Sequence, residues 1–360
     1  MKKKILATML TAILVFGIAG CGSSSSTQTT AAATTKTEET TKAAETTKTE
    51  ETTKAETSAV AAKGGKVGVC LPIRDQYWTT FEKNITADLK AAGYEVQVVV
   101  AGDAGEDVST QISQVQTFNN NGFDAVILGM ATGGNANDFL KSAGKMKVVF
   151  FNRTADASAL DGIQAIYVGM AEYDAGKAQG KWLADYFKNK GQTDVKGMMF
   201  LGTLGQDAVT NRTQGAKDAL KENGINVDWV FEQSAEWDRT KSMNMFTQFV
   251  GTGAKFDFVC SNNDDMALGV VEACSASNIK IDFPIVGVDA TQVGCLAIQS
   301  GTLAMTVNQD PAGQAKAVVN CLGQMIAGSV PKECDKDHKV ATSAVAITPS
   351  NVADLLATFK

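Results

Sequence analysis

Planar polar side chains recur directly after the apolar segments of this sequence of 360 residues, and two tryptophans stand among them. Carboxylates, amides and guanidinium groups offer hydrogen-bond donors and acceptors at fixed positions, which suits binding of a small polar molecule. The only histidine, His338, lies outside the set, which argues against a Ser-His-Asp triad and a His-rich zinc site. The candidate binding residues are Asp75, Gln76, Trp78, Asn152, Arg153, Gln206, Arg212, Trp237, Asn263, Asp289 and Gln309.

This combination of residue types matches the chemistry of a sugar. Each sugar hydroxyl both donates and accepts a hydrogen bond, and bonds to ionised groups are the stronger ones. Flat aromatic rings cover the C–H faces of a sugar ring with a large contact area. We therefore expect Trp78 and Trp237 to enclose the ligand from its two sides. The alternative is that both tryptophans are core residues.

Helix capping offers a second explanation for part of the set. Asp and Asn directly after a strand are common N-caps of the next helix. For Asp75 and Asn262, capping is at least as good an explanation as ligand contact. We expect Asp264 to cap its helix through Met266, which leaves Asn263 to face the ligand.

Strand-like and helix-like segments alternate through the sequence after about residue 64. Phe81, Ile85 and Leu89 recur at helical spacing before Gly93, and similar segments lie between β-branched runs. This alternation predicts an α/β fold with two successive parallel sheets of similar size, whose ligands bind beyond the carboxyl ends of the strands. Strands are expected over 66–71, 94–100, 124–128, 147–151, 197–201, 226–231, 256–260 and 284–288.

The N-terminus has the pattern of an export signal. Three lysines precede an apolar run that ends in Ile18-Ala19-Gly20-Cys21, and this ending resembles the lipobox of bacterial lipoproteins. We expect residues 1–20 to be a signal peptide and Cys21 to be lipidated; the alternative is an ordinary secretory signal. Residues 21–63 repeat Thr, Glu, Lys and Ala with nothing apolar to bury, which predicts a disordered tether. The protein is then expected on the extracytoplasmic face of the cell membrane.

Several classes of site are not supported by the sequence. The net charge of -6 argues against nucleic acid as a partner. The sequence has no dinucleotide-binding fingerprint, no P-loop lysine, no C-x-x-C pair and no EF-hand loop, so we expect no cofactor and no metal. Cys70 and Cys260 are expected to be buried, and Cys321 and Cys334 are candidates for a disulfide.

Three segments carry a family likeness. Residues 148–153 with 167–169, residues 261–269 (SNNDDMALG) and residues 286–290 (VGVDA) resemble the type I periplasmic sugar-binding proteins, nearest the galactose/glucose-binding and ribose-binding proteins. The resemblance covers residues 66–360. It implies two doubly wound lobes that are joined by three crossovers and close on the sugar by a hinge motion. It places one lobe in residues 64–169 and 310–343 and the other in 170–309 and 344–360.

The resemblance also implies roles for individual residues. Trp78 and Trp237 fall on the stacking aromatics, and Asp75 or Gln76 falls on a ligand of the first strand. Two departures leave the sugar open, since Gln206 and Ala208 stand where the galactose/glucose type has His and Asp. Residues 191–196 are too short to form that type's calcium loop. Polar ligand positions fall on Asn152, Arg153, Arg212, Asn263, Asp289 and Gln309, the last being the ribose-type residue.

Together these observations predict a monomeric, lipid-anchored protein that binds a monosaccharide and delivers it to the permease of an ABC importer, without catalysis. A hexose such as glucose or galactose is expected, with a pentose as the alternative. A sugar sensor that presents its ligand to a membrane chemoreceptor or kinase is a second hypothesis. A third hypothesis is an exported carbohydrate-active enzyme; a glycosidase needs two carboxylates at a set separation, which Asp289 with Asp238 or Asp264 could nominally supply, but post-strand amides and arginines suit binding. A repressor of the same fold would need a basic DNA-binding head, which this N-terminus lacks.

Overall fold

The computed structural model describes residues 64–102 and 107–359. The signal peptide, Cys21 and the tether lie outside the described residues, so their assignments stay predictions. Within the two described ranges, no helix has the length and apolar character needed to cross a membrane.

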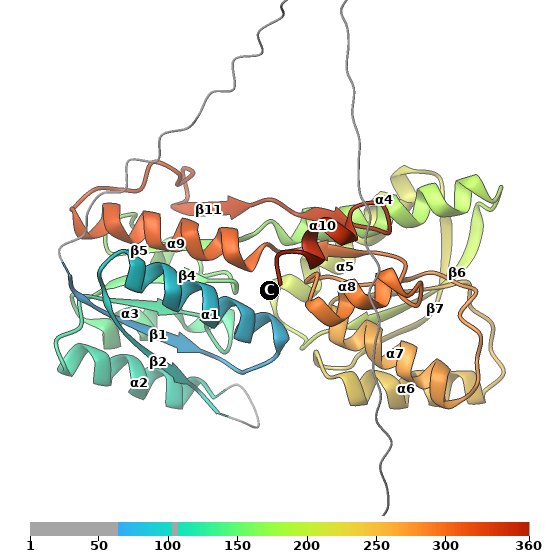
Figure 1. The fold of residues 1–360 in the computed structure, drawn as a ribbon, viewed down its shortest axis with the longest axis horizontal. Helices are drawn as coiled ribbons and strands as arrows, with labels where there is room; N and C mark the ends of the chain where they lie inside the picture. The colour runs from blue at the N-terminus through green and yellow to red at the C-terminus, as the bar shows by residue number, and fades with distance from the viewer. Residues whose placement is uncertain (1–63, 103–106, 360) are drawn as a thin grey trace, which may run out of the picture. The chain divides into compact units, whose positions relative to one another are not determined.

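The first lobe is built on a parallel sheet of six strands in the order β11-β5-β4-β3-β1-β2 (Figure 1). Helices α1 and α9 cover one face of the sheet and helices α2 and α3 cover the other, each through an apolar stripe. The elements are β1 (Lys66–Leu71), α1 (Gln76–Ala91), β2 (Glu95–Val100), α2 (Val108–Asn120), β3 (Ala125–Leu128), η1 (Gly133–Asn135), α3 (Ala136–Ala143), β4 (Lys147–Phe151), η2 (Ala157–Ala159), β5 (Ala165–Met170), α9 (Pro311–Ile326) and β11 (Lys339–Thr342).

The second lobe is built on a parallel sheet of four strands in the order β7-β6-β8-β9. Helices α4 and α5 cover one face, and α6, α7 and α8 cover the other. A short antiparallel pair, β10 with β12, adjoins this sheet through isolated bridges. The elements are α4 (Glu172–Asn189), β6 (Asp194–Leu201), α5 (Asp207–Glu222), β7 (Asn226–Ser234), α6 (Arg239–Gly251), β8 (Phe258–Ser261), α7 (Asp264–Ala276), β9 (Ile285–Val286), α8 (Gln292–Gln299), β10 (Thr306–Asn308), β12 (Val345–Ile347) and α10 (Val352–Leu356).

The chain passes between the two sheets three times. It leaves the first sheet after β5, returns from β10 into α9, and leaves again from β11 to β12. The α/β class and the parallel sheets are confirmed, but the prediction of two successive sheets of similar size from the strand rhythm is wrong. Strand β11, which pairs with β5, completes the first sheet from a distant part of the chain, and the sheets have six and four strands. The lobe boundaries stay a prediction.

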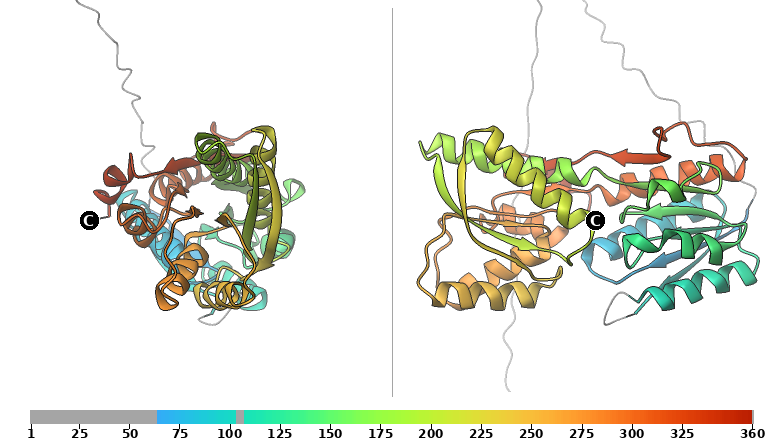
Figure 2. Two further views of the ribbon diagram at one scale, coloured as in Figure 1. Left: turned by 90° about the vertical axis from the view of Figure 1, so that its right-hand side faces the viewer. Right: turned by 180° about the vertical axis from the view of Figure 1, so that it is seen from behind.

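Helices α4 and α5 lie side by side at unusually close range (Figure 2). A Cβ added at Gly176 of α4 would lie 2.0 Å from the main-chain oxygen of Arg212 in α5. A Cβ at Gly215 of α5 would likewise lie 2.2 Å from the oxygen of Tyr173. Since only glycine permits this approach, the backbones of the two helices touch, and the first turn of α4 is placed against Arg212.

The candidate disulfide is not formed. Both Cys321 and Cys334 are free thiols, as are the other four cysteines of the described part of the chain. Cys321 is buried in α9, and the half-buried Cys334 packs against the same apolar cluster. The prediction that Cys70 and Cys260 are buried is confirmed.

Candidate ligand-binding site

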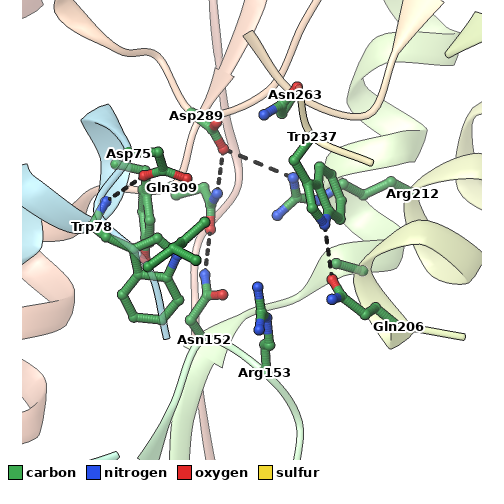
Figure 3. Close-up of a pocket in the computed structure, with 13 residues that line it drawn as sticks. Asp75, Trp78, Asn152, Arg153, Gln206, Arg212, Trp237, Asn263, Asp289 and Gln309 are labelled. Carbon is green, nitrogen blue, oxygen red and sulfur yellow. Dashed lines mark hydrogen bonds and ion pairs between the residues drawn. The ribbon is translucent and has the colours of Figure 1, made fainter. Parts of the chain in front are cut away.

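A cavity of about 40 Å³ lies between the lobes, and side chains from both of them line it (Figure 3). Every predicted site residue except Gln76 lines this cavity. Gln76 instead borders a second pocket, beside Arg74, which Asp75 also lines; of the two residues, only Asp75 lines the cavity between the lobes. Three lining residues were not predicted as contacts. The lining residues are Ile73, Asp75, Tyr77, Trp78, Asn152, Arg153, Gln206, Ala208, Arg212, Trp237, Asn263, Asp289 and Gln309.

Asp75 both caps a helix and faces the cavity. Its carboxylate accepts a hydrogen bond of 2.8 Å from the backbone N–H of Trp78 and so caps α1. Burial raises the pKa of Asp75 to about 6, although the hydrogen bond from Trp78 acts in the opposite direction. Asp75 therefore caps α1 and also lines the cavity, and its contact with a ligand stays a prediction.

Trp78 belongs to the core as well as to the cavity wall. Its side chain is buried and makes edge-to-face contacts with Phe81 and Phe151, with ring centroids 6.4 and 5.7 Å apart. The next residue back, Tyr77, donates its hydroxyl hydrogen to Gln314 of α9 over 2.7 Å. These contacts fix the aromatic wall of the first lobe before any ligand arrives.

Trp237 forms the opposite wall and is held in a strained backbone. Its φ of 65° lies in the left-handed region, and its ring packs over Gly202, where a Cβ would come within 2.1 Å. The indole N–H donates to Oε1 of Gln206 over 3.0 Å, and the guanidinium of Arg212 lies 5.8 Å from the ring centroid. The ring is half-buried, is tied at its polar edge, and lines the cavity.

A chain of polar contacts links the lobes across the cavity. Asn152 of the first lobe donates to Oε1 of Gln309 over 3.3 Å, and Gln309 donates in turn to Asp289 of the second lobe. Asn152 and Asp289 both have positive φ, at 63° and 120°, a strain of the kind that clusters at functional sites. Burial raises the pKa of Asp289 well above its usual value, with Arg212 acting against that shift.

Arg212 is the charged centre of the second lobe's wall. Its Nε donates to Glu172 over 2.6 Å, its Nη1 donates to the main-chain oxygen of Asn262 over 2.8 Å, and Asp289 lies 3.8 Å away. The pKa of Arg212 is raised, because Glu172 and Asp289 outweigh the opposing effect of burial. The sequence prediction did not include Glu172.

The start of α7 differs from its prediction. Asn263, not Asp264, caps the helix by accepting from the N–H of Met266 over 3.0 Å, and Asn263 also lines the cavity. Asp264 is fully buried and accepts from the backbone N–H of Thr291 over 2.9 Å. It therefore organises the turn that presents Asp289. Asn262 does not cap; its side chain bonds Thr213.

Arg153 is anchored on the backbone. Its Nη1 donates to the main-chain oxygens of Met130 and Ala131, at 2.8 and 2.5 Å. Of the lining residues that the sequence missed, Ile73 and Tyr77 stand beside predicted residues, so proximity was an available signal. Ala208 carries no polar group, but the resemblance already placed it where the galactose/glucose type has Asp.

Residues 67–329 match the family model described as "Periplasmic binding protein domain". The chain belongs to this family. The resemblance predicted from the sequence motifs is confirmed, and the fold is that of its type I members.

Relatives in this family are named as binding proteins. The D-galactose/methyl-galactoside binding periplasmic protein of Haemophilus influenzae is 28% identical over 315 residues, which are 83% of this chain and 94% of the relative. The xylitol-binding protein of Mycolicibacterium smegmatis is 27% identical over 289 residues, covering 80% of this chain and 78% of the relative. A solute-binding protein of an ABC transporter from Bacillus halodurans, solved with bound myo-inositol, superposes with a TM-score of 0.72 at 26% identity, covering 82% and 98%.

Proposed function

We propose that this protein captures a monosaccharide or a closely related polyol between its two lobes and delivers it to an ABC importer. The observation that carries the proposal is the cavity itself, where carboxylates, amides and arginines from both lobes converge between Trp78 and Trp237. A polyhydroxylated ring needs donors and acceptors around its edge and flat apolar surfaces on its faces. The same set offers no activated nucleophile, so the proposed mechanism is binding with closure.

The relatives support this ligand class without fixing the ligand. Their names and titles mention a galactoside, xylitol and myo-inositol, which are all compact molecules rich in hydroxyl groups. A hexose such as glucose or galactose is our first candidate, and a pentose or a cyclic polyol is the alternative. The proposed ligand contacts are the predicted residues that line the cavity, with Asp75 in place of Gln76.

Closure of the two lobes would let a partner protein distinguish the ligand-bound form from the ligand-free form. The Asn152–Gln309–Asp289 contacts cross from one lobe to the other. A sugar that bonds to both lobes favours the closed arrangement by its differential affinity. The proposal further includes diacylation of Cys21 and a tether over residues 21–63, which would hold a monomeric receptor at the outer face of the membrane beside its permease.

A thermal-shift panel with the full chain tests the proposal. The panel contains D-glucose, D-galactose, D-ribose, xylitol and myo-inositol, with an amino acid and a dipeptide as controls. A ligand at 100 times its dissociation constant should add about 2.7 kcal/mol to the free energy of unfolding. We expect at least one sugar or polyol to raise the melting temperature. A shift with the control class alone would overturn the proposal.

A further inference from the structure

Glu172 does not line the cavity, yet it is the closest charged partner of a residue that does. It is the first residue of α4, is 6% exposed, and its Oε2 lies 2.6 Å from Nε of Arg212. Its other oxygen, Oε1, is buried without a hydrogen-bond partner among the described residues. A buried carboxylate is costly unless it is paired. The close α4–α5 contact therefore keeps Glu172 in a position where Arg212 is its main source of stabilisation.

Glu172 changes what Arg212 offers to a ligand. A guanidinium has five N–H groups. Glu172 takes the Nε group and the main-chain oxygen of Asn262 takes one on Nη1, which leaves three on a side chain that lines the cavity 3.8 Å from Asp289. Before a ligand binds, the guanidinium of Arg212 is thus flanked by Glu172 at 2.6 Å and by the carboxyl group of Asp289 at 3.8 Å.

The other charged residues of the site do not add a cation that would favour an acidic ligand. Arg153 directs its Nη1 to the backbone oxygens of Met130 and Ala131. Asp75 adds a third acidic group, on the lining of the same cavity as Arg212 and Asp289. A carboxylate on the ligand would lie among these acidic groups, with the charge of Arg212 already met by Glu172 and that of Arg153 opposed by Asp75.

We propose that Glu172 is a positioning and specificity-determining residue, which orients Arg212 and cancels its charge so that the site takes uncharged sugars and rejects sugar acids. This inference rests on the proposed sugar-binding function. A negative charge in the site repels a negatively charged ligand, and such repulsion can separate two ligands of similar shape. Glucose and glucuronate, or galactose and galacturonate, differ at one carbon, so they isolate the effect of charge.

Isothermal titration of the full chain at pH 7.5 tests this inference with D-glucose, D-galactose, D-glucuronate and D-galacturonate. We expect the wild-type protein to bind a neutral hexose at least about 100-fold more tightly than the matching uronate, since like-charge contacts cost several kcal/mol. Glu172→Gln should weaken binding of the neutral hexose about tenfold. It should also reduce the ratio of the uronate's dissociation constant to that of the neutral hexose at least about tenfold. The matched control is Glu222→Gln, which removes an exposed 3.3 Å ion pair between the same two helices and should leave both affinities unchanged.

The outcomes separate the inference from the proposed function. Wild-type protein that binds the uronate as tightly as the neutral hexose overturns the inference and leaves sugar binding intact, whether or not the variant folds. Equal weakening of both ligands in Glu172→Gln also overturns it, because a purely structural role predicts that pattern. If none of the four sugars binds, and only the amino acid or the dipeptide raises the melting temperature in the thermal panel, the proposed function and the inference both fail.

Discussion

The contact between α4 and α5 gives a prediction whose sign depends on the structure. Alanine for glycine inside a helix ordinarily stabilises a protein by about 0.5–1 kcal/mol. At Gly176, however, the new Cβ would lie 2.0 Å from the oxygen of Arg212, about 1.4 Å inside an ordinary contact. The neighbour is backbone and cannot rotate away, so α4 and α5 must separate.

Overpacking of this kind costs about 1–3 kcal/mol, and the severity of the contact places it at the upper end. After the gain in helix propensity, Gly176→Ala should lower the free energy of unfolding by about 2 kcal/mol, which is about 4–8 °C in melting temperature. Because the clash is with Arg212 itself, we also expect sugar affinity to fall about tenfold or more, since small misplacements of a positioned group are expensive.

Gly323→Ala is the matched control. Gly323 also lies inside a helix, α9, but a Cβ there has no atom within 4 Å. This variant should raise the free energy of unfolding by about 0.5–1 kcal/mol and leave affinity unchanged. Urea unfolding and isothermal titration measure both quantities. If Gly176→Ala is as stable as Gly323→Ala and binds sugar normally, the α4–α5 contact does not position Arg212 and the reasoning fails.

Three further predictions concern the cavity and the thiols. Trp237→Ala should weaken sugar binding at least about tenfold while Trp237→Phe keeps most of it, because the ring face is what contacts the ligand; equal affinities by titration would contradict the role. Burial raises the pKa of Asp75 to about 6, so the carboxylate is ionised above pH 6 and protonated below it. If it accepts from a ligand hydroxyl, affinity should fall about fivefold from pH 6 to pH 5, and a pH profile as steep in Asp75→Asn would contradict this. A thiol reagent applied to the native protein should modify only Cys334 among the described cysteines, because the other five are buried; rapid labelling of Cys321 would show that α9 opens.

The sequence predicted the parts of the site that local rules control. Arg212 and Asp289 were predictable because polar residues after parallel strands meet at one edge of a sheet. The exact residue at which a helix begins is harder to predict. Asp75, not Gln76, caps α1. At the start of α7, Asn263 occupies the N-cap position that was expected for Asp264. A shift of one residue decides which side chain faces the cavity.

Long-range packing explains what the sequence did not reveal. Glu172 is an ordinary acidic residue at a helix start, and only the glycine contact with α5 makes it the partner of Arg212. Helix α4 itself escaped the periodic pattern because its buried face includes Gly176, Gln179 and Gly180 in place of large apolar residues. Strand β11 is four residues long and takes its place from pairing with β5.

The most direct test of the account is isothermal titration of the full chain with the sugar or polyol that gives the largest thermal shift. We predict one ligand per chain, with binding reduced at least about 100-fold in Asp289→Ala, which truncates a buried acidic group at the centre of the proposed contacts. The exposed pair of Lys181 with Asp185 provides a control in Asp185→Ala, which should bind normally. Titration heat that is unchanged in Asp289→Ala, with the variant correctly folded, would contradict sugar binding in this cavity.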